Sequence, residues 1–246
     1  MKARPTLAHT AYQLLAEGRV ADLGKRVASR LYGHCTSYGL RRDLEVPFAA
    51  PKAKIPIAVR KLIASDIPVL LPDQSGLDAA TSWDIRVRRA HLESEIPQCY
   101  VAVDQRNDTP CYFQWLMGPA HNAEIQAFFQ ESFPLLRPHE ALLEGAYTPA
   151  QYRGMGIMPA AMAEIAERAA EMGARYVITF VDRHNIASLK GCKKAGFNPY
   201  VERRDAQLLF RNKRSFTLLP EPFLMRTSAG RVHDPRRMTD FALSII

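Results

Sequence analysis

The clearest pattern of apolar and polar positions lies in the second half of the chain. Residues 141–147 form a short, mainly apolar run that predicts a strand. Residues 157–172 carry apolar side chains at steps of four and three, which predicts a helix with one buried face. The segment between them contains Gly154 and Gly156. A glycine-bearing turn at a helix start presents backbone N–H groups at the positive end of the helix dipole, which suits phosphate groups.

Similar patterns predict the other elements of the fold. Residues 175–181 are apolar without alternation, which is typical of a strand covered on both faces. The order of strands and helices predicts an α/β fold with helices on both faces of a mixed sheet. The expected helices cover residues 10–32, 78–95, 120–133 and 186–195, with a further helix start at residues 65–66, and the other expected strands cover residues 57–62, 98–104, 111–117, 198–204 and 206–218.

Glycines and prolines predict where the chain divides. Two glycines are expected to end the first helix, and three prolines indicate a linker after it: Gly33, Gly39, Pro47, Pro51 and Pro56. The predicted division is an N-terminal helical extension and linker over residues 1–50, a main domain over residues 51–219 and a C-terminal tail over residues 220–246. The first helix is basic and amphipathic, so it either packs on the domain, rests on an anionic membrane surface or binds a partner.

Composition narrows the classes of partner. The chain has 246 residues, 47% of them hydrophobic, and a net charge of +8, so it can bury a sizeable core. Lys and Arg never run beyond two in a row and are not interleaved with aromatics, which argues against nucleic acid. The four cysteines are dispersed, which favours reduced thiols and no metal site. No apolar run reaches the roughly 20 residues of a membrane span, and the N-terminus lacks a secretory pattern. We therefore expect a cytoplasmic protein that binds a polyanionic coenzyme or an acidic substrate.

The glycine turn fits neither of two common nucleotide motifs. A dinucleotide fingerprint needs a third glycine three residues after the second, and Pro159 occupies that position here. A P-loop needs a Lys-Ser/Thr pair after the glycines, and this pair is absent as well.

Two motifs, in the right order, resemble those of the GCN5-related N-acetyltransferases (GNATs). Gln151-Tyr152-Arg153-Gly154-Met155-Gly156 matches the acetyl-coenzyme A motif Gln/Arg-x-x-Gly-x-Gly/Ala of that family. Asn185, Ser188, Leu189 and Gly196-Phe197 match a second motif around the short helix after the next strand. The resemblance covers about residues 55–218. It implies a mostly antiparallel sheet that is splayed at an acyl-coenzyme A site, within an acyltransferase domain.

The resemblance also implies which residues hold acetyl-CoA, the co-substrate. Its pyrophosphate would lie on backbone N–H groups from Arg153 to Met158, and its pantetheine arm would enter between strands 141–147 and 175–181. Asn185 and Ser188 would touch the arm, and a backbone N–H near Ala146 or Tyr147 would stabilise the oxyanion. The full set of expected coenzyme residues is Ala146, Tyr147, Gln151, Tyr152, Arg153, Gly154, Met155, Gly156, Ile157, Met158, Asn185 and Ser188.

In such an enzyme an amine attacks the thioester, so a base must hold the amine deprotonated. Glu140 and Glu144 are four apart on a strand and would share one face with Leu142 and Ala146, where burial raises a carboxyl pKa. We expect Glu144 to be the base and Glu140 the substitute, while an ion pair between Glu144 and an arginine stays open.

Cys192 occupies the position where many members of the family carry a tyrosine that protonates the departing thiolate. Cys192 could act as this acid, only pack, or form a covalent intermediate with His184 as its partner.

The expected function is transfer of the acetyl group of acetyl-CoA to the primary amine of a small molecule, such as an amino sugar or another metabolite. Residues 76–95 and 118–139 are expected to select this acceptor. The alternatives are an N-acyltransferase that uses longer acyl-CoA or acyl-carrier-protein donors, with the basic first helix meeting the carrier, and a non-catalytic acyl-CoA sensor. A homodimer stays open, and no metal or nucleic acid is expected.

Overall fold

The computed structural model describes residues 32–72, 79–93, 98–129, 132–208 and 211–220. Its strands are β1 (Tyr32–Asp43), β2 (Ile57–Lys61), β3 (Cys99–Asp104), β4 (Thr109–Met117), β5 (Glu140–Tyr147), β6 (Tyr176–Asp182), β7 (Asn198–Leu208) and β8 (Arg211–Leu218). Its α-helices are α3 (Ile67–Leu70), α4 (Ala79–Glu93), α5 (Asn122–Phe129), α6 (Ile157–Glu167) and α7 (Ile186–Lys194), with 3-10 turns η1 (Ala64–Asp66), η2 (Pro119–His121), η3 (Ala150–Tyr152) and η4 (Arg168–Met172).

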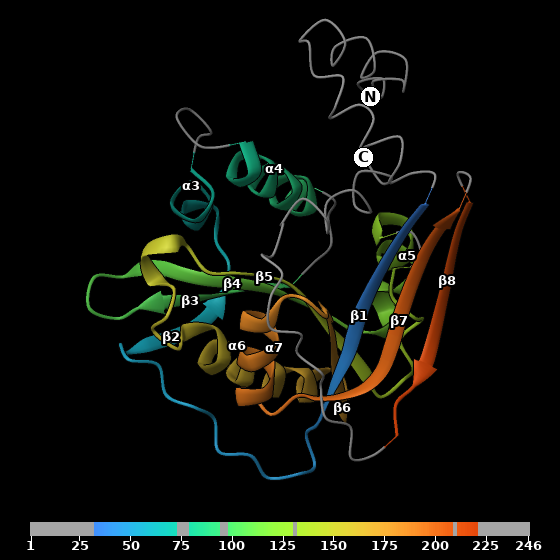
Figure 1. Ribbon diagram of the computed structural model, residues 1–246. Helices are drawn as coiled ribbons and strands as arrows, with labels where there is room; N and C mark the ends of the chain where they lie inside the picture. The colour runs from blue at the N-terminus through green and yellow to red at the C-terminus, as the bar shows by residue number, and fades with distance from the viewer. Residues whose placement is uncertain (1–31, 73–78, 94–97, 130–131, 209–210, 221–246) are drawn as a thin grey trace, which may run out of the picture.

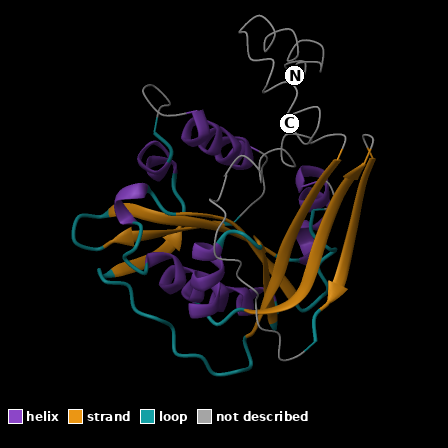
Figure 2. Cartoon of the chain, viewed as in Figure 1, coloured by secondary structure: helices purple, strands orange, loops and turns teal. Residues whose placement is uncertain are grey.

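The strands form one sheet with the order β2-β3-β4-β5-β6-β1-β7-β8 (Figure 1). Every neighbouring pair is antiparallel except β5 and β6, which run parallel. Helices cover both faces of the sheet (Figure 2). The expected mixed, mostly antiparallel α/β fold is therefore confirmed.

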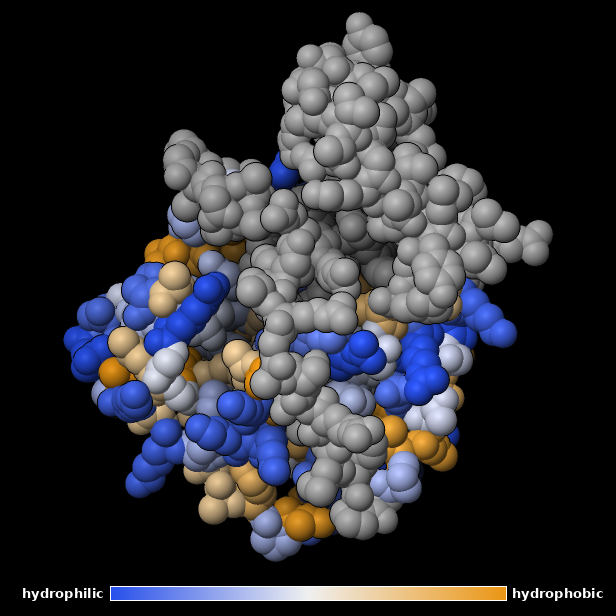
Figure 3. Space-filling model, in the orientation of Figure 1, coloured by the Kyte–Doolittle hydropathy of each residue, from blue (hydrophilic) through white to orange (hydrophobic). Residues whose placement is uncertain are grey.

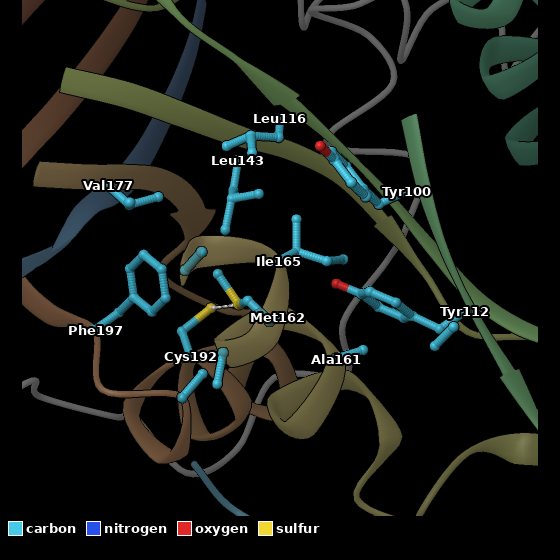
Figure 4. Close-up of a cluster of buried hydrophobic side chains, with 14 of the residues drawn as sticks. Tyr100, Tyr112, Leu116, Leu143, Ala161, Met162, Ile165, Val177, Cys192 and Phe197 are labelled. Carbon is cyan, nitrogen blue, oxygen red and sulfur yellow. Dashed lines mark hydrogen bonds between the residues drawn. The ribbon is translucent and has the colours of Figure 1, made fainter. Parts of the chain in front are cut away.

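Two buried clusters hold these layers together. The α6-side core packs α6 and α7 on the sheet and includes Leu116, Leu143, Met162 and Phe197 (Figure 4). The α5-side core, on the other face, packs α3, α4 and α5 and includes Trp115 and Ile125 among its buried members. Successive side chains of a strand point to opposite faces of the sheet, so neighbouring residues such as Leu116 and Met117 of β4 pack into different cores.

Glycines set the ends of α6 and η4. Gly156 is the N-cap of α6 with φ +72°, and Gly173 is the C-cap of η4 with φ +74°. Both conformations lie in the left-handed region, which glycine adopts at least cost. The expected helix over residues 157–172 is present, although its last part from Arg168 is a 3-10 turn.

The structure corrects three predicted elements. Residues 32–43, which were assigned to the extension and linker, form β1 between β6 and β7, so the sheet begins before residue 51. The first of the two final strands does not end before residue 205 but continues to Leu208, because Asp205 pairs with Arg214 of β8. The helix expected over residues 120–133 ends at Phe129.

Some expectations fall on other parts of the chain. The basic helix over residues 10–32 and nearly all of the tail over residues 220–246 lie outside the described residues. None of the described helices is both long and apolar enough to cross a membrane. The four cysteines are free thiols, as expected, and Cys111 and Cys192 are buried.

Candidate coenzyme and acyl-transfer site

The glycine turn lies between β5 and α6, as predicted. Gly154 and Gly156 have φ of +75° and +72°, so both need the left-handed conformation that glycine permits. The Arg153 N–H already donates to Ala150 O at 3.2 Å. Within the described residues, no backbone hydrogen bond uses the N–H groups of residues 154–158. The N–H groups left for the predicted phosphate contact therefore start at Gly154 and not at Arg153, and the contact itself stays a prediction.

Beside this turn, β5 and β6 pair only at their beginnings. Their parallel pairing consists of Glu140 with Tyr176, Ala141 with Val177 and Leu142 with Ile178. Beyond Leu142, β5 stays paired with β4, whereas β6 continues along β1 to Asp182. The two halves of the sheet part at this point (Figure 1). Strand edges carry backbone donors and acceptors that an extended ligand can use.

A β-bulge at Gly145 lies on the edge of β5 where the pairing has ended. Glu144 pairs with Trp115 and Tyr147 with Phe113, so Gly145 and Ala146 both lie opposite a single residue of β4. Gly145 has φ +71°, and a Cβ there would lie 2.6 Å from the Trp115 ring. The bulge reverses the alternation of side chains. Ala146 consequently packs against the α6-side core, and the prediction that it shares a face with Leu142 is wrong.

Glu144, the expected base, is half-buried immediately before this bulge. Burial raises the pKa of its carboxyl to about 7, and the Gly145 N–H and the charges of Arg203 and Arg88 oppose this shift only in part. Among the described residues, no ion pair joins Glu144 to an arginine. A carboxyl with this pKa exchanges protons near neutral pH, as a general base must.

Glu140 occupies a different environment at the first position of β5. Its carboxylate accepts a hydrogen bond from the Arg137 N–H at 3.0 Å, which closes the turn before the strand. This contact gives Glu140 a structural role at the end of β5 where β5 and β6 are still paired.

Cys192 lies in the α6-side core, with its Sγ 3.8 Å from the Met162 Sδ (Figure 4). Burial, together with the charge of Glu144, raises the pKa of the thiol to about 12. A buried thiol of this kind is not a ready nucleophile. The contacts favour the alternative in which Cys192 only packs.

The second motif forms the start of α7. Asn185 is the N-cap, and its side-chain oxygen accepts the Ser188 N–H at 3.1 Å. Both residues are half-buried. A cap of this kind satisfies a helix donor that would otherwise lack a partner, so the motif has a local structural reason in addition to the contact expected with the pantetheine arm.

Comparisons with known proteins agree with this arrangement. The sequence model of the Acetyltransferase (GNAT) family matches residues 83–197. This match places residues 83–197, a little under half of the chain, in the GNAT acetyltransferase family. Comparison with curated proteins gives no match.

Several solved GNAT structures are similar to the chain. The glucosamine N-acetyltransferase region of a fungal multi-domain GH3 β-N-acetylglucosaminidase has a TM-score of 0.52 at 14% identity, over 77% of this chain and 23% of that one. An acetyltransferase from Colwellia psychrerythraea has a TM-score of 0.45 at 13% identity, over 69% and 54% of the two chains. A GNAT from Sphaerobacter thermophilus has a TM-score of 0.44 at 15% identity, over 78% and 57%. The chain thus spans little more than half the length of the Colwellia and Sphaerobacter proteins. At 14% identity, the likeness to the fungal region shows the fold alone.

GNATs use acetyl-CoA, and the residues present at this site fit that co-substrate. The glycine turn offers N–H groups at the start of an 11-residue helix, with no Cβ on Gly154 or Gly156 to hinder a phosphate. Arg153 lies beside them, although its Nε donates to Thr148 O at 3.0 Å. Residues 154–158 would hold the phosphates, and the β5 edge from Leu143 to Tyr147 would meet the pantetheine arm.

A hollow in the surface lies away from this site. It has a volume of about 480 Å³ and is lined by Gly118, His121, Pro138 and Met172 among others. These residues surround the start of β5, whereas the glycine turn follows its end, so the hollow is separate from the proposed coenzyme site. Within the described part of the chain, no cluster of three His, Cys, Asp or Glu side chains could hold a metal ion.

Two features of this site were missed by sequence reasoning. The bulge had a visible signal, because a glycine inside a strand pattern often marks one. The other feature is the segment that joins β1 to β2, which lies against the glycine turn. It was interpreted as a linker because its prolines are typical of linkers. Its contact with the turn joins residues that are about 100 positions apart, so no local sequence pattern indicates it.

Proposed function

We propose that this chain transfers the acetyl group of acetyl-CoA directly to the primary amine of a small molecule. The observation that carries the proposal is Glu144, a half-buried carboxyl with a pKa near 7 at the bulge where β5 leaves β6. Acetyl-CoA supplies an activated acyl thioester. The amine attacks its carbonyl carbon, a C–N bond forms, the C–S bond breaks and coenzyme A leaves as the thiol.

Residues of this chain support deprotonation of the amine and stabilisation of the oxyanion. Glu144, in its ionised form, takes a proton from the amine and keeps it nucleophilic. The Ala146 N–H is the favoured oxyanion donor, because Tyr147 is paired with Phe113 in the sheet while Ala146 is in the bulge. Cys192 takes no proton-transfer role in this scheme, since its thiol is buried and donates a hydrogen bond to the Met162 Sδ. Proton return to the thiolate is then left to water or to the protonated base.

The acceptor is proposed to reach Glu144 from the α5-side face. On this face, the guanidinium carbon of Arg88 lies 4.6 Å from the centre of the Tyr147 ring, and that of Arg203 lies 5.5 Å from the centre of the Phe180 ring. Both arginines lower the Glu144 pKa and so lie near it. An amino sugar or another small-metabolite amine is the proposed class of acceptor.

A non-catalytic acyl-CoA sensor is the second candidate, and the burial of Cys192 is the observation that favours it. Longer acyl-CoA or carrier-bound donors are a variant of the first proposal. A thiol-release assay with a panel of amines and with acetyl, long-chain and carrier-bound donors separates these functions, because a sensor binds acyl-CoA without releasing thiol. Failure to bind any acyl-CoA by calorimetry would overturn both candidates.

Glu144→Gln tests the proposed base. We expect its turnover to fall by roughly 10²- to 10⁴-fold, the usual contribution of a general base, with little change in coenzyme binding. The base is active when ionised, so the wild-type rate should rise with pH up to about 7 and then level, and the variant should lose this rise.

Glu140→Gln is the matched control, because it makes the same chemical change at the first residue of the same strand. It should keep both the rate and the rise with pH. Loss of the rise in Glu140→Gln, with the rise kept in Glu144→Gln, would assign the base to Glu140.

A further inference from the structure

The segment that joins β1 to β2, residues 44–56, runs across the α6 and α7 layer and is fixed at several points (Figure 1). Its Leu44 N–H donates to Arg175 O at 2.9 Å. Its Phe48 ring lies 3.0 Å from the position of a Cβ at Gly196, beyond the end of α7. Its Pro56 O accepts the Gln105 N–H at 3.1 Å. We call this segment the β1–β2 connector.

The connector also touches the glycine turn. The Lys54 N–H donates to Met155 O at 2.8 Å. A Cβ at Gly156 would lie 3.6 Å from Lys52 O and 3.8 Å from Ala53 Cα. Ala53 and Ile55 pack against the α6-side core, while Lys52 and Lys54 alternate with them and are exposed. The contact with Met155 is therefore made by a segment that is itself anchored to the core.

This bond fixes the orientation of one peptide unit in the turn. In a trans peptide the C=O and the following N–H point in opposite directions. Because Met155 O is held by Lys54 N–H, the Gly156 N–H must point away from the connector. The Gly156 N–H is one of the groups that no backbone hydrogen bond uses within the described residues, and it lies at the N-cap of α6.

We propose that the β1–β2 connector is a positioning element of the coenzyme site, in which the Lys54 N–H holds Met155 O so that the Gly156 N–H faces the phosphates of the coenzyme. The inference rests on the proposed function, because it needs a coenzyme phosphate at this turn. A donor that is already oriented loses no conformational freedom when the ligand binds, which raises affinity. Without the connector bond, the peptide unit between Met155 and Gly156 can rotate more freely, since the rotation changes the φ of Gly156 and glycine permits a wide range of φ.

Charge offers a competing account of the same contact. Lys52 and Lys54 are exposed cations beside the turn, and they would attract phosphates even if the backbone bond had no effect. The two accounts differ in what a substitution removes. Lys54→Ala removes the charge and keeps the N–H, whereas Lys54→Pro removes both.

The experiment measures coenzyme A binding by calorimetry for the full-length chain and three variants. Lys54→Pro removes the N–H that holds Met155 O. Ala53→Pro is the matched control, because it places a proline in the same segment at an N–H that no backbone hydrogen bond uses among the described residues. We expect the Kd to rise about tenfold or more in Lys54→Pro, as for the loss of a hydrogen bond to a charged group, and at most about threefold in Ala53→Pro and Lys54→Ala.

Each outcome decides the proposal. Wild-type affinity in Lys54→Pro would overturn it, as would an equal loss in Ala53→Pro, which would assign the effect to the stiffness of the segment. An equal loss in Lys54→Ala would assign it to charge. If the wild-type chain binds no coenzyme A, the proposed function fails and not merely this inference.

If Lys54→Pro does not fold, amide hydrogen exchange of the wild-type chain gives the answer. Saturating coenzyme A should slow the exchange of both the Lys54 and Gly156 amides, because a phosphate on Gly156 favours the peptide orientation that the Lys54 bond holds. Slower exchange at Gly156 with no change at Lys54 would overturn the proposal.

Discussion

At the scale of single residues, the site depends on one glycine as much as on the carboxylate beside it. Gly145 turns Ala146 to the opposite face and leaves two backbone positions of β5 opposite one of β4. The raised pKa of Glu144 could be predicted from its apolar strand neighbours, and burial is indeed its main cause. The prediction that Ala146 lies on the same face as Glu144 is wrong, because a bulge shifts the alternation of side chains along the strand by one residue.

Gly145→Ala should destabilise the fold strongly. The new methyl group would need φ +71° and would lie 2.6 Å and 2.7 Å from two carbons of the buried Trp115 ring. Left-handed backbone costs roughly 1–2 kcal/mol for a residue with a Cβ, and overpacking costs roughly another 1–3 kcal/mol. We expect the free energy of unfolding in urea to fall by about 2–5 kcal/mol, the sum of the two costs.

Gly173→Ala is the matched control for this measurement. Gly173 has φ +74°, but a Cβ there has nothing within 4 Å, so only the backbone cost applies. The expected loss is about 1 kcal/mol. Equal losses in the two variants would mean that Trp115 yields to the methyl group.

At the scale of elements, most of the fold could be predicted and the N-terminal strand could not. The hairpin of β3 and β4, the strands β5 and β6, and the helices α6 and α7 have strong apolar patterns of their own. Residues 32–43 are mostly polar and contain Gly33 and Gly39. They form a strand because β6 and β7 pair with them on either side. Gly39 fits there because a Cβ would lie 2.3 Å from Val201 Cγ1.

Removal of β1 should therefore prevent folding. A chain that begins at residue 51 lacks both ladders of β1 and the buried Tyr38 and Leu40. The net stability of a typical domain is only roughly 5–15 kcal/mol, so we do not expect the fold to tolerate the loss of a central strand. We expect no cooperative thermal unfolding transition for that chain, and a retained transition for a chain that begins at residue 30. A cooperative transition in the shorter chain would show that the sheet closes without β1.

At the scale of the whole molecule, the sheet consists of two halves that meet at three residue pairs of β5 and β6. One half carries the glycine turn and Glu144, and the other contains β6, β1, β7 and β8. On the face shown in Figure 3, hydrophilic described residues surround small patches of apolar residues. The net charge of +8 belongs to the whole chain and does not by itself point to the site. The sheet topology predicts more, because a ligand between the halves must touch both.

Coenzyme A binding should consequently protect backbone amides on both sides of this gap. At 100 times its Kd, a ligand stabilises the folded state by about 2.7 kcal/mol, and the melting temperature of a chain of this size should rise by roughly 5–10 °C. Amide exchange should slow in residues 143–147 of β5, in residues 179–182 of β6 and in the glycine turn. Adenosine 3′,5′-bisphosphate, which carries phosphates but no pantetheine arm, is the matched ligand, and it should protect the turn alone. Equal protection of β5 by both ligands would contradict the proposal that the arm lies along that strand, because the phosphates alone would then account for the effect.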